Sequence, residues 1–188
     1  MLSYPPFLPG GPQQLGWIEV IVGCMFSGKT SELIRRVKRA QYARQPVVVF
    51  RPELDRRYSD DNVDTHSGQH IRSLRVSRAA DIPELSRDAR VVGIDEGQFF
   101  DEELVEICDM LANAGKRVIV AGLDLDYLGR PFGPMPALLC TAEYIQKTLA
   151  ICVICGAPAD RSQRTVARSA QVLVGESEAY EARCRLHW

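Results

Sequence analysis

The 188-residue sequence lacks any imbalance of charge and any long apolar run. Its 23 Lys and Arg residues against 24 Asp and Glu residues leave a formal net charge of −1, so no general basic field favours nucleic acid as a partner. No apolar stretch approaches the roughly 18 residues of a membrane-spanning helix, so we expect no membrane partner. Residues 1–16 lack a basic region followed by an apolar stretch, which predicts no secretory signal and a cytoplasmic protein.

Composition divides the chain into three parts. Residues 1–16 are rich in Pro and Gly, which predicts a flexible N-terminal tail. Residues 17–150 alternate strand-like and helix-like segments, which is typical of an α/β domain. Residues 151–188 are too few to bury a core of their own, so this segment needs a staple such as a bound metal.

The middle part predicts a doubly wound parallel sheet. We expect strands over 17–22, 47–50, 89–94, 118–121 and 148–153, and helices over 31–45, from 101 onward and over 136–144. Wholly apolar strands such as 47–50 are typical of a parallel sheet that is buried on both faces. Residues 51–69 and 156–170 are polar and are interpreted as loops, with a short strand near Ile71, Leu74 and Val76. Such sheets bind ligands at the carboxyl ends of their strands.

A phosphate-binding loop follows the first expected strand and precedes the first expected helix. It matches G-x-x-x-x-G-K-[ST], the P-loop pattern of proteins that bind ATP or GTP. Its glycines let successive backbone N–H groups point at one spot, Lys29 supplies positive charge for the β/γ-phosphates, and Thr30 offers a hydroxyl to Mg²⁺. The loop residues are Gly23, Cys24, Met25, Phe26, Ser27, Gly28, Lys29 and Thr30.

Two adjacent carboxylates end the third expected strand. Asp95 stands where a P-loop enzyme places the carboxylate that helps to hold Mg²⁺, although an Asp here could also cap the next helix. Adjacent residues on a strand point apart, so Glu96 is available for a different task. A general base is the natural hypothesis for Glu96, and a solvated loop residue is the alternative.

Four residues near the C-terminus have zinc-ligand spacing. Cys152 and Cys155 form one pair, and Cys184 and His187 form the other. Three thiolates and an imidazole suit a closed tetrahedral site, which predicts structural zinc in the undersized segment. Buried free thiols or a redox pair are the alternatives. Of the remaining cysteines, Cys108 and Cys140 are expected in the core and Cys24 at a permissive loop position.

Taken together, these motifs resemble the type II thymidine kinases, the zinc-containing family that includes the human cytosolic enzyme. The resemblance extends from about Trp17 to Trp188. It rests on the P-loop at 25–30, on 55–58, on Asp-Glu-Gly-Gln-Phe-Phe at 95–100, on 122–124 with Tyr127 and 131–133, on the Cys-x-x-Cys pair, and on 180–187.

The resemblance implies a role for each matching residue. Glu96 would take the proton from the 5′-hydroxyl of thymidine, and the zinc-anchored lasso after Cys155 would close over the nucleoside. The P-loop would surround the ATP phosphates and Mg²⁺ together with Asp55, Arg56, Arg57, Asp95, Gly97 and Gln98. The nucleoside would contact Met25, Phe99, Leu123, Tyr127, Ser162 and Tyr180, and the lasso backbone at Gln171, Val172, Leu173, Val174 and Gly175.

Three positions depart from the common family pattern. Tyr127 stands where many members have Phe, Ser162 where Thr is usual, and Glu176 where some members have Gly. These differences bear on fine specificity rather than on the reaction. A role for His66 in the polar loop is suggested only by its position.

The expected function is transfer of the ATP γ-phosphoryl group to thymidine, and to deoxyuridine, giving dTMP in pyrimidine salvage. The resemblance also implies a homotetramer and feedback inhibition by dTTP. A P-loop NTPase switch that acts on water or another acceptor is one alternative. A zinc-stapled nucleic-acid-binding module is another, disfavoured because the arginines near the zinc motif are interspersed with acidic residues.

Overall fold

The computed structural model describes residues 15–53, 62–64, 70–165 and 179–188. Its centre is a sheet in the order β5-β2-β6-β7-β1-β8, in which every neighbouring pair of strands is parallel. The strands are β1 (Trp17–Val22), β2 (Val47–Pro52), β5 (Leu74–Val76), β6 (Val91–Ile94), β7 (Arg117–Gly122) and β8 (Tyr144–Lys147). The predicted parallel sheet is confirmed.

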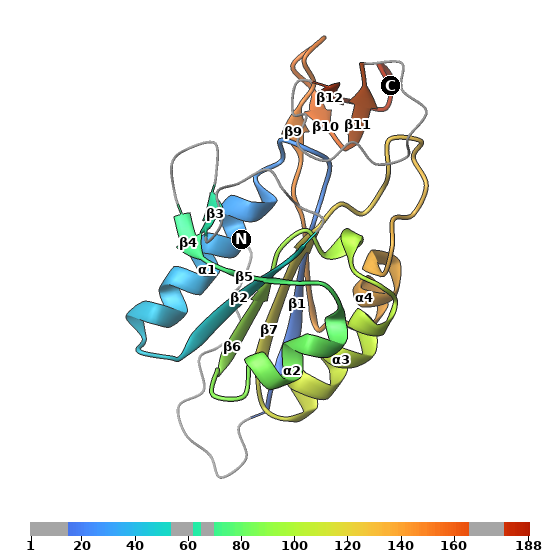
Figure 1. Cartoon of the computed structure of the whole chain (residues 1–188). Helices are drawn as coiled ribbons and strands as arrows, with labels where there is room; N and C mark the ends of the chain where they lie inside the picture. The colour runs from blue at the N-terminus through green and yellow to red at the C-terminus, as the bar shows by residue number, and fades with distance from the viewer. Residues whose placement is uncertain (1–14, 54–61, 65–69, 166–178) are drawn as a thin grey trace.

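Helices cover both faces of this sheet (Figure 1). On one face α1 (Lys29–Tyr42) packs Leu33, Ile34 and Val37 against Ile21 and Ile119. The other face is covered by η1 (Ala79–Asp81), α2 (Ile82–Leu85), α3 (Glu103–Asn113) and α4 (Met135–Thr141), while η2 (Gly97–Phe99) follows β6. The apolar stripe of α3 is buried as its spacing predicts. Among the residues described, no helix is both long and apolar enough to cross a membrane.

Among the residues described, three small antiparallel pairs accompany the central sheet. β3 (Asn62–Asp64) pairs with β4 (His70–Arg72). β9 (Ala150–Ile151) pairs with β10 (Pro158–Ala159), and β11 (Arg161–Arg164) pairs with β12 (Tyr180–Arg183). The last two pairs lie together beyond the P-loop end of the sheet, at the top of Figure 1.

Several sequence predictions were wrong in the C-terminal half. The helix expected over 136–144 ends at Thr141, because Ala142 is extended, and Tyr144–Lys147 is the edge strand β8. Only Ala150–Ile151 of the strand expected over 148–153 is a strand, and it pairs with β10 rather than with the main sheet. The loop expected over 156–170 contains β10 and β11.

Two further corrections concern single residues. Cys140, expected in the core, is exposed, whereas Cys108 is buried as expected. Arg51, expected at the start of a polar loop, is 1% exposed within β2. The division of the chain at residues 16 and 150 stays a prediction.

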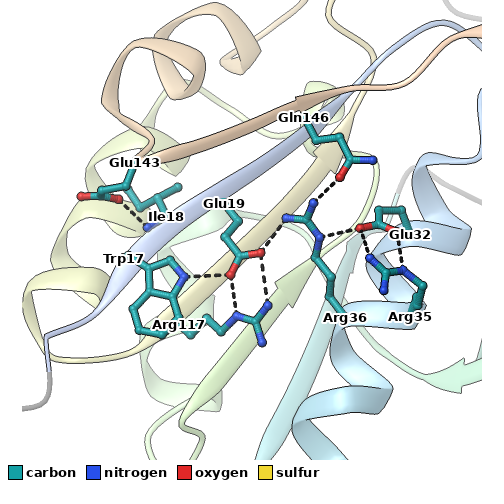
Figure 2. Close-up of polar contacts among 9 residues, drawn as sticks. All are labelled: Trp17, Ile18, Glu19, Glu32, Arg35, Arg36, Arg117, Glu143 and Gln146. Atoms are coloured by element: carbon teal, nitrogen blue, oxygen red, sulfur yellow. Dashed lines mark hydrogen bonds and ion pairs between the residues drawn. The ribbon is translucent and has the colours of Figure 1, made fainter. Parts of the chain in front are cut away.

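A buried carboxylate joins the edge of the sheet to α1 (Figure 2). Glu19 of β1 is 1% exposed and accepts hydrogen bonds from three side chains. Its Oε1 receives the Trp17 indole N–H at 2.7 Å and the Arg117 Nε–H at 2.5 Å, while its Oε2 receives an Arg36 Nη1–H at 2.6 Å. Arg36 also donates to Gln146 of β8 at 2.5 Å. The carboxylate thus joins β1, β7 and α1, and Arg36 extends the contact to β8.

Candidate active site

The P-loop runs from the end of β1 into the first turn of α1, as the pattern predicts. Gly28 has a φ of 83°, a left-handed conformation that glycine adopts without steric cost. A Cβ added at Gly23 would lie 2.2 Å from the Thr148 carbonyl oxygen, so this position also requires glycine. The Lys29 Nζ donates to the Cys24 carbonyl at 2.8 Å, across the inside of the loop. A loop of this shape at a helix N-terminus is suited to bind phosphate.

Carboxylates surround the P-loop lysine. Burial lowers the pKa of Lys29, while the negative charges of Glu96, Asp95 and Asp124 oppose that shift. The Thr30 hydroxyl faces both oxygens of Asp95, at 3.3 and 3.2 Å, and Asp95 is buried at the carboxyl end of β6. A hydroxyl beside a carboxylate is a fitting oxygen donor set for Mg²⁺. The structure therefore brings Lys29, Thr30 and Asp95 together as predicted.

Glu96 is held in an unusual backbone conformation by a defined partner. Its φ of 52° and ψ of 42° are left-handed, which few residues other than glycine adopt. The Gln98 Nε2 donates to Glu96 Oε2 at 2.5 Å, and the Gln98 Oε1 accepts the Leu123 backbone N–H at 2.9 Å. Gln98 thereby fixes the Glu96 carboxylate relative to the end of β7. Strained residues with a supporting contact of this kind cluster at functional sites.

The described side chains that are predicted to contact the nucleoside are buried or partly buried and come from four parts of the fold. Phe99 packs edge-on against Phe132 with ring centroids 5.6 Å apart. The Ser162 Oγ accepts the Met25 backbone N–H at 3.0 Å, which joins β11 to the P-loop. Leu123, Tyr127 and Tyr180 share the intermediate burial of Met25 and Phe99. The predicted residues Asp55, Arg56, Arg57, His66, Gln171, Val172, Leu173, Val174, Gly175 and Glu176 lie outside the described part of the chain.

The four predicted metal ligands converge. The ligand atoms of Cys152, Cys155, Cys184 and His187 all lie within 4.8 Å of one another. The Cys155 and Cys184 sulfurs are 3.7 Å apart, and the His187 Nδ1 lies 3.2 Å from the Cys184 sulfur and 3.9 Å from the Cys152 sulfur. These spacings suit corners of a tetrahedron around zinc with metal–ligand bonds of roughly 2.0–2.3 Å.

The protonation of the first ligand also suits a metal. Burial raises the pKa of the Cys152 thiol, but backbone N–H groups, first that of Cys184 and then those of Ile154 and Cys155, outweigh burial and lower it, while the neighbouring Cys155 thiol has a raised pKa. A thiolate is the form that binds zinc. The donor set fits structural zinc. An ion bound there would join β9 to β12 and would take no part in the reaction.

Sequence reasoning missed how closely the P-loop packs against the metal-binding segment. Cys24 was expected at a permissive position, but it is buried and its Sγ donates to the Ala159 carbonyl at 3.2 Å. Burial raises the pKa of this thiol. The Thr148 hydroxyl lies 2.9 Å from the Ser27 hydroxyl, which fixes the loop to the segment after β8. Neither Cys24 nor Thr148 carries a sequence pattern that would have indicated these contacts.

Lys147 and Arg164 at the site were also missed, and Asp124 was named only within the pattern at 122–124 and given no role. Asp124, directly after Leu123, pairs with Lys147 at 2.7 Å. Its Oδ1 is buried with no hydrogen-bond partner among the residues that the structure describes. Arg164 stacks on Tyr127 and bonds to Tyr180. Its position two residues after Ser162 on a strand, and so on the same face, is the one signal that could have found it.

The sequence is similar to known proteins over most of its length. A family model described as "Thymidine kinase" matches residues 16–188. A thymidine kinase of Rhodothermus sp. (strain ITI 518) is 57% identical over 171 residues, covering 91% of this chain and 80% of the relative. A thymidine kinase of Bdellovibrio bacteriovorus is 53% identical over 174 residues, covering 92% and 85%. Among solved structures, the Legionella pneumophila ATPase DotB has a TM-score of 0.43 at 17% identity, with 68% of this chain and 34% of that chain covered.

Proposed function

Because the chain belongs to the thymidine kinase family and phosphorylates thymidine, we propose a role in this reaction for each of the main residues of its site. The γ-phosphoryl group of ATP passes to the 5′-hydroxyl of thymidine to give dTMP. Lys29 and the P-loop N–H groups bind the phosphates, and Glu96 orients and deprotonates the hydroxyl. Such transfers depend mostly on positioning and charge stabilisation.

Thr30 and Asp95 are the residues that would hold Mg²⁺. When bound there, the ion supplies positive charge at the β/γ-phosphates. The Thr30 hydroxyl already lies 3.2 Å from an Asp95 oxygen, so the two donors are close enough to share one cation. Lys29, directly before Thr30 in the chain, brings a second positive charge to the same phosphates.

The contact that carries the assignment of Glu96 is its hydrogen bond from Gln98. One Gln98 amide holds Glu96 through its N–H₂ and the end of β7 through its oxygen. Because Leu123 follows β7 directly, the same amide links the base to a residue proposed for the nucleoside pocket. A general base needs this kind of fixed distance to the proton that it removes.

Glu96→Gln should lower turnover by about 10²–10⁴-fold, the usual contribution of a positioned base. Glu106→Gln is the control, since Glu106 is exposed on α3. ADP release is measured with and without thymidine, and the nucleotide product is identified. Near-normal turnover in Glu96→Gln would remove Glu96 from this role. If the unmodified protein forms ADP at the same rate with and without thymidine, the result would indicate the alternative, a P-loop NTPase with water as acceptor.

We also propose, from the family resemblance, that deoxyuridine is a second substrate and dTTP a feedback inhibitor. A homotetrameric, cytoplasmic enzyme and the lasso contacts of 171–175 belong to the same proposal. The convergence of Cys152, Cys155, Cys184 and His187, and the buried contact of Cys24 with Ala159, support the lasso part of this proposal, because they bring the metal-binding segment beside the P-loop. Sedimentation and inhibition measurements test the assembly and the dTTP effect directly.

A further inference from the structure

We propose that Arg164 is a positioning residue that holds Tyr127 and Tyr180 in place and so sets the affinity for the nucleoside. The inference rests on the proposed function, because it takes these two tyrosines to line the thymidine pocket. Arg164 lies in neither of the patterns that carry the family resemblance at 152–155 and 180–187. It is 9% exposed, which is unusual for a charged side chain without a specific task.

Its guanidinium contacts both rings. The Arg164 Cζ lies 3.7 Å from the centroid of the Tyr127 ring and 5.4 Å from that of the Tyr180 ring. The Nη2 donates to the Tyr180 hydroxyl at 2.7 Å, and the Nε faces the same oxygen at 3.2 Å. A planar guanidinium can stack and donate at once, whereas the point charge of a lysine cannot.

The pairing of β11 with β12 explains why Arg164 lies beside the two tyrosines. In the β11–β12 pair Arg164 is opposite Tyr180, and Ser162 is opposite Ala182. Ser162 and Arg164 share one face of β11, and the first contacts the Met25 N–H of the P-loop at 3.0 Å. One strand therefore touches the phosphate loop at one position and the two tyrosines at the other.

The metal site anchors the same pair of strands. β12 ends at Arg183, directly before the ligand Cys184. The Val153 N–H, next to the ligand Cys152, donates to the Ala182 carbonyl of β12 at 3.1 Å. The zinc ligands are thereby connected through β12 and β11 to Arg164. The groups proposed for chemistry, Lys29, Thr30 and Glu96, have positioning contacts of their own, so the arginine should affect binding more than turnover.

The test is Arg164→Lys, which keeps the charge and loses the stacked, forked donor. We expect the KM for thymidine, and its Kd by calorimetry, to rise about 10- to 100-fold, because a desolvated stack and a charge-assisted hydrogen bond are both lost. We expect kcat and the KM for ATP to stay within about threefold, because a loss confined to substrate binding leaves turnover unchanged.

Arg161→Lys is the matched control. Arg161 lies on the same strand, stacks on the Trp188 ring at 5.4 Å and pairs with Asp160 at 2.7 Å. Arg161 makes the same kinds of contact as Arg164 but with Trp188 and Asp160 instead of the tyrosines, so the KM of this variant for thymidine should not change. Equal effects of the two substitutions, or a fall in kcat and a rise in the ATP KM alongside the thymidine KM, would overturn the proposal.

A second variant keeps the proposal testable if Arg164→Lys does not fold. Tyr180→Phe removes only the hydroxyl that Arg164 binds, and should raise the thymidine KM in the same direction with kcat kept. An unchanged KM in Tyr180→Phe would contradict the inference. If the unmodified protein released no thymidine-dependent ADP, the proposed function itself would be wrong. That outcome is distinct from a failure of the Arg164 proposal, which is measured by comparing the variants with an active unmodified protein.

Discussion

The buried carboxylate of Glu19 should contribute more to stability than its single charge suggests. It lies inside the sheet and satisfies an indole N–H and two guanidinium groups at once. Glu19→Gln keeps the shape, but it places an amide N–H₂ toward Arg36 and Arg117, which are themselves donors. The variant thus leaves buried donors without an acceptor instead of simply removing an ion pair.

The size of the effect follows from what each partner keeps. Removing one member of a buried pair costs roughly 3–5 kcal/mol. We expect about 3 kcal/mol here, the lower end of that range, because Arg36 retains Glu32 at 2.8 Å and Gln146 at 2.5 Å. A domain of this size loses about 2–4 °C in Tm per kcal/mol, so the Tm should fall by about 6–12 °C.

Urea unfolding of Glu19→Gln beside Glu84→Gln measures this difference. Glu84 pairs with Arg87 at 3.3 Å, but both side chains are more than three-quarters exposed, and such pairs contribute only about 0–1 kcal/mol. A Glu19→Gln variant that unfolds within about 1 kcal/mol of the Glu84→Gln control would refute the reasoning, because it would place a buried pair in the range of an exposed one.

The pH dependence of the free energy of unfolding is a second test of the same prediction. Burial raises the pKa of Glu19, but the hydrogen bond and charge of Arg117, the Trp17 indole and the charge of Arg36 outweigh it and hold the pKa below its usual value. A carboxylate whose pKa is lowered by folding stabilises the protein above its unfolded pKa, about 4.3. That contribution is lost as the pH falls through the folded pKa. The stability gap between Glu19→Gln and the unmodified protein should therefore be full at neutral pH and narrow in acid; a gap of equal size at both would contradict the assignment.

Two other predictions concern the bound ions. Cys152→Ser should lose bound zinc and several kcal/mol of stability, since a structural zinc site contributes its binding energy to folding, whereas Cys140→Ser on the exposed surface of α4 should change neither. Full stability without bound zinc would show that the metal is not structural. Thr30→Ala should raise the Mg²⁺ concentration needed for half-maximal turnover and Thr30→Ser should restore it, because serine returns the hydroxyl that faces Asp95; equal Mg²⁺ dependence in both variants would exclude Thr30 as a ligand.

The central sheet could be predicted because its strands are marked by composition. Strands that are buried on both faces are usually apolar throughout, and 47–50 and 118–121 stand out in this way, whereas 17–22 is apolar except for Glu19. The shape of the P-loop, the position of Asp95 beside Thr30 and the convergence of the four Cys and His residues could be predicted, because such sites impose a spacing along the chain. Helix α1 shows the usual uncertainty at boundaries, since it ends at Tyr42 rather than continuing to residue 45.

The edge strand and the C-terminal hairpins could not be predicted in the same way. β8 has largely exposed side chains, so its pairing with β1 leaves no apolar signature. β11 reads Arg-Ser-Gln-Arg, a polar sequence typical of a loop, and becomes a strand only through its partner β12. Tertiary contacts override local preference in such short elements. Arg164 was missed for the same reason, because it contacts the rings of Tyr127 and Tyr180, which are distant from it in the sequence.

The same contacts argue that the metal-binding segment is part of the active site rather than an attachment to it. Cys24 of the P-loop packs in one apolar cluster with the zinc ligands Cys152 and Cys184 and with Ala159. The Ser162 hydroxyl accepts the next N–H of the same loop. Because tightly packed interiors transmit a local displacement to their neighbours, a change in this cluster reaches the phosphate loop directly. Zinc held by these ligands would therefore order the phosphate loop through Cys24 and Met25. Through Arg164 it would also order the tyrosines that we propose for the nucleoside pocket.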